Sequence, residues 1–280
     1  HDTVTVTTSL TMPGASVAIT AEQITVNAGI TLTAGAMTFT ALDEDLTGGF
    51  GPLPAEIASL VFDEDQAVLA DSAATIDLTG ATLTSTGAIT LSATATATLN
   101  TTGFTFDDVS IAVGYAKTNA QVILSNTTIT ATSLDIDAVS NATASAAITA
   151  NTGESAEDTD AVVAVAVADG NATARISGSS ALNVAGAVSL TATNTRTVTA
   201  NADGAHTAAG ATLALSIVRG STLAYVDGTT AIDAPSNEAD SIAVGAITNT
   251  TATPTATSTP GGAQETTTGT TKAEDKLADY

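Results

Sequence analysis

One pattern of about 50 residues recurs along most of the chain and limits what the chain can fold into. Copies begin at Ala74, Ala120 and Ala172, and a weaker copy begins at Thr222, so the starts lie 46, 52 and 50 residues apart. Each copy ends in a small apolar run followed by a polar turn, as in residues 162–171. A unit of this size is too small to bury its own apolar side, so the units must stack and share a core.

Within each unit, apolar and polar residues alternate. The run VSLTATNTRTVTANADG, residues 188–204, has Ser or Thr at six consecutive alternate positions from Ser189 to Thr199. A period of two is typical of a strand with one wet face, and Thr and Val favour strands because branching at Cβ restricts χ1. We therefore expect Ala192 and Val198 to face a narrow interior, while the Thr row faces outward.

Stacked strands of this kind predict an all-β fold, a parallel β-solenoid (β-helix) in which each strand has a parallel partner above and below. The composition agrees, because the chain is 44% hydrophobic but only 3% aromatic and has no Trp. A core of Ala, Val, Ile and Leu suits opposing walls that lie close together. The alternative is a string of immunoglobulin-like sandwiches, but these need about 100 residues per domain and usually a bulky aromatic core.

The repeats divide the chain into a β-solenoid over residues 1–249 and a tail over residues 250–280. The predicted repeat units of the solenoid are 74–119, 120–171, 172–221 and 222–249. An insertion over residues 43–73 breaks the pattern, and its Gly/Pro turn followed by AEIASLV indicates one short helix that begins near Pro54. The tail is rich in Thr, Pro and Gly, which predicts a linker or an extended arm.

The charge balance excludes several partners. Against 29 acidic residues the chain has six basic ones, a formal charge of −23. Such a surface repels phosphate, so we expect no nucleic-acid partner, and no apolar run is long enough for membrane insertion. Cysteine is absent, which removes disulfides and thiolate chemistry. Because the chain begins with His1 rather than Met, we interpret it as a mature product or a segment of a longer protein.

The repeats resemble those of giant repetitive bacterial surface proteins, the filamentous-haemagglutinin-like exoproteins and the leukotoxin-type filamentous adhesins. The resemblance covers roughly residues 74–248 and is carried by DGNATARISGSSALNVAGAVSLTATNTRTVTANADG, residues 169–204, and by the units 74–119 and 120–171. It implies a secreted β-helix that serves as a stalk, sheath or adhesive fibre, and it transfers no catalytic residue. This chain is far shorter than typical members of the family.

We therefore expect an extracellular structural protein at the cell surface, an element of a fibre, sheath or adhesin that self-associates into filaments. The ends of a solenoid are open strand edges, which pair with another copy unless they are capped. Head-to-tail contacts do not close, so they produce open polymers. The partners would be further copies or neighbouring surface proteins. The alternative is a monomeric ligand-binding module of a larger adhesin, with its site on the loops around residues 43–73 or 151–160.

Two acidic clusters are the candidates for a metal site. Asp43 and Asp45 form one, and Asp63 and Asp65 form the other. Carboxylates from two loops could converge on Ca²⁺, which takes roughly six to eight oxygen ligands. However, the chain contains no EF-hand loop and no Gly-Gly-x-Gly-x-Asp nonapeptide, and charged loops of an acidic protein are usually only solvated. No cofactor other than Ca²⁺ is indicated.

We expect no enzymatic activity. A polysaccharide lyase or hydrolase, the enzyme alternative, needs a basic residue or paired carboxylates in a groove. His206 is the one histidine inside the chain, and the basic residues are scattered: Lys117, Arg175, Arg196, Arg219, Lys272 and Lys276. The Thr-x-Thr rows also resemble the hydroxyl faces of ice-binding solenoids, but Asp135 and Asp137 interrupt their register.

Overall fold

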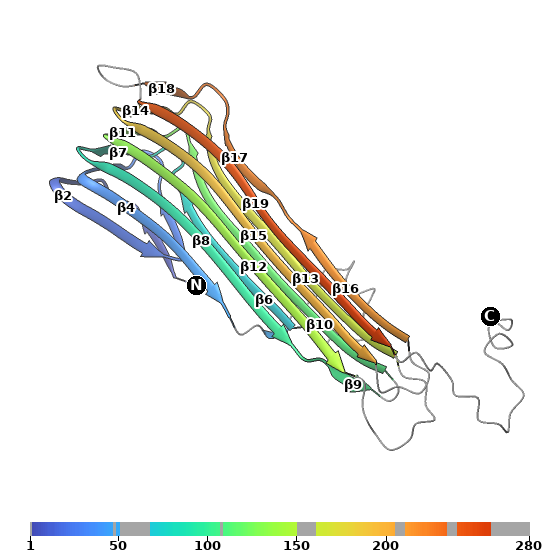
Figure 1. Cartoon of the computed structure of the whole chain (residues 1–280). Helices are drawn as coiled ribbons and strands as arrows, with labels where there is room; N and C mark the ends of the chain where they lie inside the picture. Colours follow the sequence, from blue (N-terminus) through green and yellow to red (C-terminus); the bar gives the residue numbers. More distant parts are fainter. Residues whose placement is uncertain are drawn as a thin grey trace, which may run out of the picture.

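The chain folds into two facing sheets of mostly parallel strands, as the computed structural model in Figure 1 shows. The structure describes residues 2–46, 49–50, 68–106, 109–149, 161–204, 211–233 and 240–258. These residues contain strands and turns but no helix. The predicted all-β fold with parallel strands is confirmed.

Sheet A has nine strands, in the order β1-β3-β6-β10-β13-β16, with β17 also on β13. Its parallel strands are β1 (Thr3–Val6), β3 (Gln23–Val26), β6 (Val68–Asp77), β10 (Val109–Ser125), β13 (Ala161–Ser177), β16 (Ala211–Arg219) and β17 (Thr222–Val226). Two short strands pair antiparallel: β5 (Gly49–Phe50) with β6, and β9 (Phe104–Phe106) with β10.

Sheet B has ten strands, all of them parallel to their neighbours. Its long strands are β2 (Leu10–Ala21), β4 (Thr31–Asp45), β8 (Ala88–Thr101), β12 (Ser133–Thr149), β15 (Ala187–Gly204) and β19 (Ser241–Ser258). Its short strands are β7 (Thr82–Ser85), β11 (Thr128–Ala131), β14 (Ala181–Val184) and β18 (Ala231–Asp233).

The chain crosses from sheet A to sheet B and back in each repeat. From β10 it turns through β11 into β12 and then returns to sheet A as β13, which lies beside β10. The colours of Figure 1 therefore change in sequence order across both sheets. The passages from A to B run through the short strands on one side of the stack. The returns from B to A leave from the opposite side, after residues such as Thr149 and Gly204.

The register of the strands matches the predicted repeat. Ala120 lies beside Ala74 on one side and beside Ala172 on the other, and Ala172 lies beside Thr222. The first residues of the four copies therefore form one row across sheet A. The intervals of 46, 52 and 50 residues between the copies are therefore the sequence separations between paired residues of neighbouring strands in sheet A.

The alternation of the sequence separates the two faces of strands such as β15. In β15, Ala192 and Val198 are fully buried, while the Thr row between them is only partly buried. The expectation for these residues is confirmed. Buried side chains from both sheets fill the space between them, and aliphatic residues dominate because the sheets face each other closely.

A row of polar groups crosses the interior. The hydroxyl oxygens of Thr118 in β10 and Ser140 in β12 lie 2.6 Å apart, and both side chains are fully buried. One repeat later, Asn194 donates through Nδ2 to the carbonyl oxygens of Gly170 and Ser221. The row separates a core of Leu and Ile beside the short strands from a second core rich in Ala. Its hydrogen bonds favour one register, because a shifted strand would leave these buried groups unpaired.

The predicted insertion and tail are wrong at their boundaries. Residues 43–45 are the end of β4, and residues 68–73 belong to β6, so both ends of the predicted insertion are regular strands. The helix expected near Pro54 lies outside the described residues. Residues 250–258, assigned to the tail, continue β19 and pair with β15. Among the described residues, none forms a helix that could cross a lipid bilayer.

Candidate functional sites

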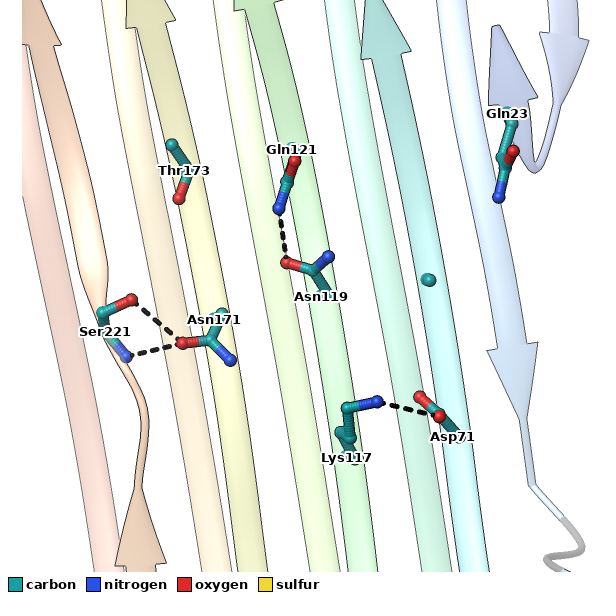
Figure 2. A pocket seen from close by; sticks show the side chains of 9 residues that line it. Gln23, Asp71, Lys117, Asn119, Gln121, Asn171, Thr173 and Ser221 are labelled. Atoms are coloured by element: carbon teal, nitrogen blue, oxygen red, sulfur yellow. Dashed lines mark hydrogen bonds and ion pairs between the residues drawn. The ribbon is translucent and has the colours of Figure 1, made fainter.

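A hollow of about 570 Å³ lies on the outer face of sheet A (Figure 2). Its walls come from β3, β6, β10 and β13 and from the turn between β16 and β17. The lining residues are Gln23, Asp71, Ala73, Lys117, Asn119, Gln121, Asn171, Thr173 and Ser221. Only Ala73 lacks a polar side chain. The hollow is therefore a polar site of the size that small ligands occupy, roughly 300–1,000 Å³.

The repeat places the central residues of this hollow in one row. Asn119 lies beside Ala73 on one side and beside Asn171 on the other. Each of these residues directly precedes the start of a repeat copy, as Ser221 precedes Thr222. The copies, aligned by their starts, would have brought the two asparagines together. This was the sequence signal for the hollow, and our sequence reasoning missed it.

Hydrogen bonds hold the amides of the hollow in fixed orientations. Gln121 donates from Nε2 to Oδ1 of Asn119 at 2.9 Å (Figure 2). The backbone N–H and the hydroxyl of Ser221 donate to Oδ1 of Asn171 at 3.0 and 2.9 Å. These contacts occupy the amide oxygens of both asparagines. Nδ2 of Asn171 also donates to Oδ1 of Asp169 at 3.5 Å, so Nδ2 of Asn119 is the asparagine donor without a partner among the described residues.

An ion pair closes one side of the hollow. The Nζ atom of Lys117 lies 3.0 Å from Oδ2 of Asp71, and both side chains are partly exposed. The hydrogen bond to Asp71 raises the pKa of Lys117. Because the two charges cancel, the hollow carries no net charge of its own.

A second ionic cluster lies beside the first on the same face of sheet A. Nε of Arg219 lies 2.8 Å from Oδ2 of Asp169, and the hydroxyl group of Tyr115 contacts both side chains. The guanidinium group of Arg219 also lies 5.5 Å from the centre of the Tyr115 ring, within the range of a cation–π contact. Burial raises the pKa of Tyr115, and the hydrogen bond with Arg219 opposes this effect. The ring is 4% exposed, so it offers no free surface for stacking.

The predicted calcium ligands have structural roles where the structure describes them. Asp43 is buried, and its Oδ2 accepts a hydrogen bond from the backbone N–H of Ala73 at 2.6 Å. Oδ2 of Asp45 accepts from the N–H of Asp71 at 3.0 Å. Asp63 and Asp65 lie outside the described residues. Within the described ranges, no three His or acidic side chains gather as a metal site would require.

Two of the basic residues considered for a lyase, Lys117 and Arg219, lie in one row of sheet A on either side of Asp169. Lys117 and Arg219 are engaged in the two ion pairs above, whereas Arg196 points into the interior and is 8% exposed. Arg175 is in β13, and its Nε is buried without a hydrogen-bond partner among the residues that the structure describes. His206, Lys272 and Lys276 lie outside the described residues.

The C-terminal end of the stack is an open edge. Among the described strands, β16 and β17 pair only with β13, β18 only with β14, and β19 only with β15. The side chains of β19 that continue the inward rows of β15 are not covered: Ile242 is 53% exposed, and Val244 is 49% exposed, while their neighbours Val188 and Leu190 are buried. This end therefore presents a strip of unfinished interior.

The N-terminal end of the stack is partly capped. Strand β3 covers only Thr75–Asp77 of β6, and the carboxylates of Asp43 and Asp45 satisfy amides of β6 that β3 does not reach. The other edge strand, β2, contains Pro13 and a register shift between Met12 and Ser16. Inward charges, proline and bulges are the usual devices that prevent strands from pairing at an edge.

Comparisons with known proteins give no match among family models, curated proteins or solved structures. What the hollow and the open edge can bind therefore follows from their own residues.

Proposed function

We propose that this chain is an extracellular structural protein, a parallel β-solenoid that forms part of a cell-surface fibre, sheath or adhesin and self-associates end to end. The passage of the chain between two sheets supports the solenoid, since the successive repeats add parallel strands to sheet A and a short and a long parallel strand to sheet B. The resemblance of the repeats to bacterial filamentous surface proteins supports the setting, because such proteins are built from stacked repeats.

The observation that carries the proposal is the unfinished interior at the C-terminal end. Ile242 and Val244 follow the same inward rows as Val188 and Leu190, which the next strand covers. A further strand on β19 would bury these side chains and pair its free backbone groups. A second copy supplies such strands at its N-terminal end, where Leu10 and Met12 continue the inward rows of β4 and are exposed. The cap on β6 confines this contact chiefly to sheet B. Because Pro13 and the register shift interrupt β2, the contact would use the two regular parts of that strand, residues 10–12 and 16–21.

The test places a charge on the face that association would bury. The variant Val244→Lys tolerates its charge in the free chain, because residue 244 is half exposed. In the assembly the same charge would be buried without a partner, which costs several kcal/mol, so association should be lost. Electron microscopy and sedimentation of the full chain and the variant measure this outcome.

The matched control is Ile247→Lys on the same strand. Ile247 is also 49% exposed, but it lies beside the partly buried Thr193 on the outer side of sheet B, which stays exposed after stacking. This variant should form the same filaments as the original chain. Monodisperse single copies of the original chain would contradict the proposal. Species that stop at two copies would also contradict it, because they would indicate that C-terminal ends pair with each other.

A further inference from the structure

We propose that the hollow on the outer face of sheet A binds a neutral, hydroxyl-rich oligosaccharide. Sugar hydroxyl groups donate and accept hydrogen bonds in pairs, and amide side chains offer both functions within one planar group. The hollow gathers four amide side chains: Gln23, Asn119, Gln121 and Asn171. Hydroxyl groups of Thr173 and Ser221 extend the same polar surface.

The orientation of the amides leaves defined donors and acceptors for a ligand. The contact between Gln121 and Asn119 uses Nε2 of the first and Oδ1 of the second. Oε1 of Gln121 and Nδ2 of Asn119 have no hydrogen bond to the residues that the structure describes. The two groups lie on neighbouring side chains of β10 in Figure 2. A pair of adjacent sugar hydroxyls can accept from one and donate to the other without reordering either side chain.

The charge of the site selects a neutral ligand. Lys117 is neutralised by Asp71 at 3.0 Å, so it does not present a free cation to a carboxylate or sulfate group. The whole chain has a formal net charge of −23, which repels a polyanionic glycan at a distance. An extended peptide is less suitable, because peptides add to the edge of a sheet, whereas this hollow lies on its face.

The expected affinity of one hollow is weak. Aromatic stacking would strengthen sugar binding, but the ring of Tyr115 is buried under Arg219 and is not available. Hydrogen bonds to neutral hydroxyls contribute only about 1 kcal/mol each, because both partners lose water. A polysaccharide that carries many equivalent sugar units compensates through repeated contacts when several copies of the chain are present.

Affinity electrophoresis of the full chain tests the proposal. The native gels contain dextran, mannan or galactan as neutral probes, and alginate as an acidic probe. At least one neutral polysaccharide should retard the chain, and alginate should not. The double variant Asn119→Ala, Gln121→Ala removes the free donor and acceptor but no contact to the backbone, so the fold should persist. It should weaken the retarding interaction by about tenfold or more.

The matched control changes asparagines on the opposite sheet. Asn141 in β12 and Asn183 in β14 are partly buried on the outer side of sheet B, so Asn141→Ala, Asn183→Ala should leave the retardation unchanged. Val244→Lys, the variant designed to block assembly, should still be retarded, which separates this site from the proposed end-to-end contact. Absence of retardation by all three neutral probes, equal retardation by alginate, or unchanged retardation of the hollow variant would each overturn the proposal.

Discussion

Gly220 shows how closely neighbouring strands approach at the point where β16 gives way to β17. Its φ angle is +124°, a conformation that side chains disfavour, and a Cβ atom there would overlap the carbonyl oxygen of Gly170. Gly170 is restricted in turn, since a Cβ atom on it would lie 2.5 Å from Oδ1 of Asn194. The two glycines lie in consecutive repeats and let Asn194 reach the carbonyl oxygens of Gly170 and Ser221.

We predict that Gly220→Ala lowers the free energy of unfolding by about 3 kcal/mol, because it combines an unfavourable φ with a clash against backbone. Denaturant unfolding followed by circular dichroism measures the change. Gly245→Ala is the matched control: Gly245 lies in the repeat that follows, and nothing is within 4 Å of a Cβ added there. Equal stability of Gly220→Ala and the original chain would contradict this account of the turn.

The sequence predicts most inward-facing residues, but it fails at the polar ones. Ala192 and Val198 follow from the alternation, and both are buried as expected. Asn194 and Arg196 occupy the same inward row, where the alternation of apolar and polar residues predicts apolar side chains. Their environment depends on Gly170, which lies 24 residues before Asn194 in the chain and opposite it in the fold. Only the pairing of the sheets reveals that contact.

At the scale of a strand, β12 carries two carboxylates on its outer face. Each of them, Asp135 and Asp137, lies between a hydroxyl residue of β8 and a hydroxyl residue of β15. Burial raises the pKa of Asp137, the charge of Asp135 raises it further, and a hydrogen bond from Thr191 opposes both. The folded state therefore holds the proton more tightly than the unfolded state does. The contribution of protonated Asp137 to stability is therefore fully present below the unfolded pKa of about 3.9, and it is lost as the pH rises through the folded pKa.

It follows that Asp137→Asn should raise the melting temperature at neutral pH, where the original carboxylate is ionised and unfavourable. The gain should shrink as the pH falls and vanish below about 3.9, where both residues are uncharged. Thermal unfolding at a series of pH values measures the difference between the two proteins. A gain that is independent of pH would indicate that the charge of Asp137 is not its cause.

The end of β19 shows why some element boundaries escape sequence reasoning. Residues 250–258 are rich in Thr and include Pro254, and Pro260 follows them in the sequence. Proline is uncommon inside strands. This composition is typical of a linker, so the sequence predicts a tail from residue 250. In the fold they pair with β15 through the backbone, and Pro254 is tolerated because β19 is at the edge of sheet B among the described strands. The partner strand, not the local composition, extends β19 to Ser258.

For the whole molecule, the net charge of −23 opposes association of identical copies. The proposed contact is apolar, so screening of the charges should favour it. We predict that filament length and the fraction of sedimented protein rise between about 0.02 M and about 0.5 M sodium chloride, as the Debye length falls to a few ångströms. Light scattering and sedimentation measure the change. Dissociation at high salt would instead indicate an interface held by ion pairs.

The candidate sites differ in how far the sequence could predict them. Open edges follow from stacked repeats, but the partial cap does not, because Asp43 and Asp45 resemble a metal cluster until β6 is placed beside them. The hollow needs the repeats to be aligned residue by residue. Asn119 and Asn171 are separated by a whole repeat, and nothing in either local sequence marks a site.

The two sides of the stack differ in how regularly the paired strands follow one another in the sequence. On one side, the short strands β7, β11 and β14 hold each crossing in register with the next. On the other side, the long strands of sheet B end at residues such as Thr149 and Gly204, and the next strands of sheet A begin after unequal intervals in the sequence, at Ala161 and Ala211. Foreign peptides spliced into that flank should leave the paired backbone intact. In a polymer they would be displayed along one seam, at intervals set by the spacing of strands, about 4.8 Å per repeat.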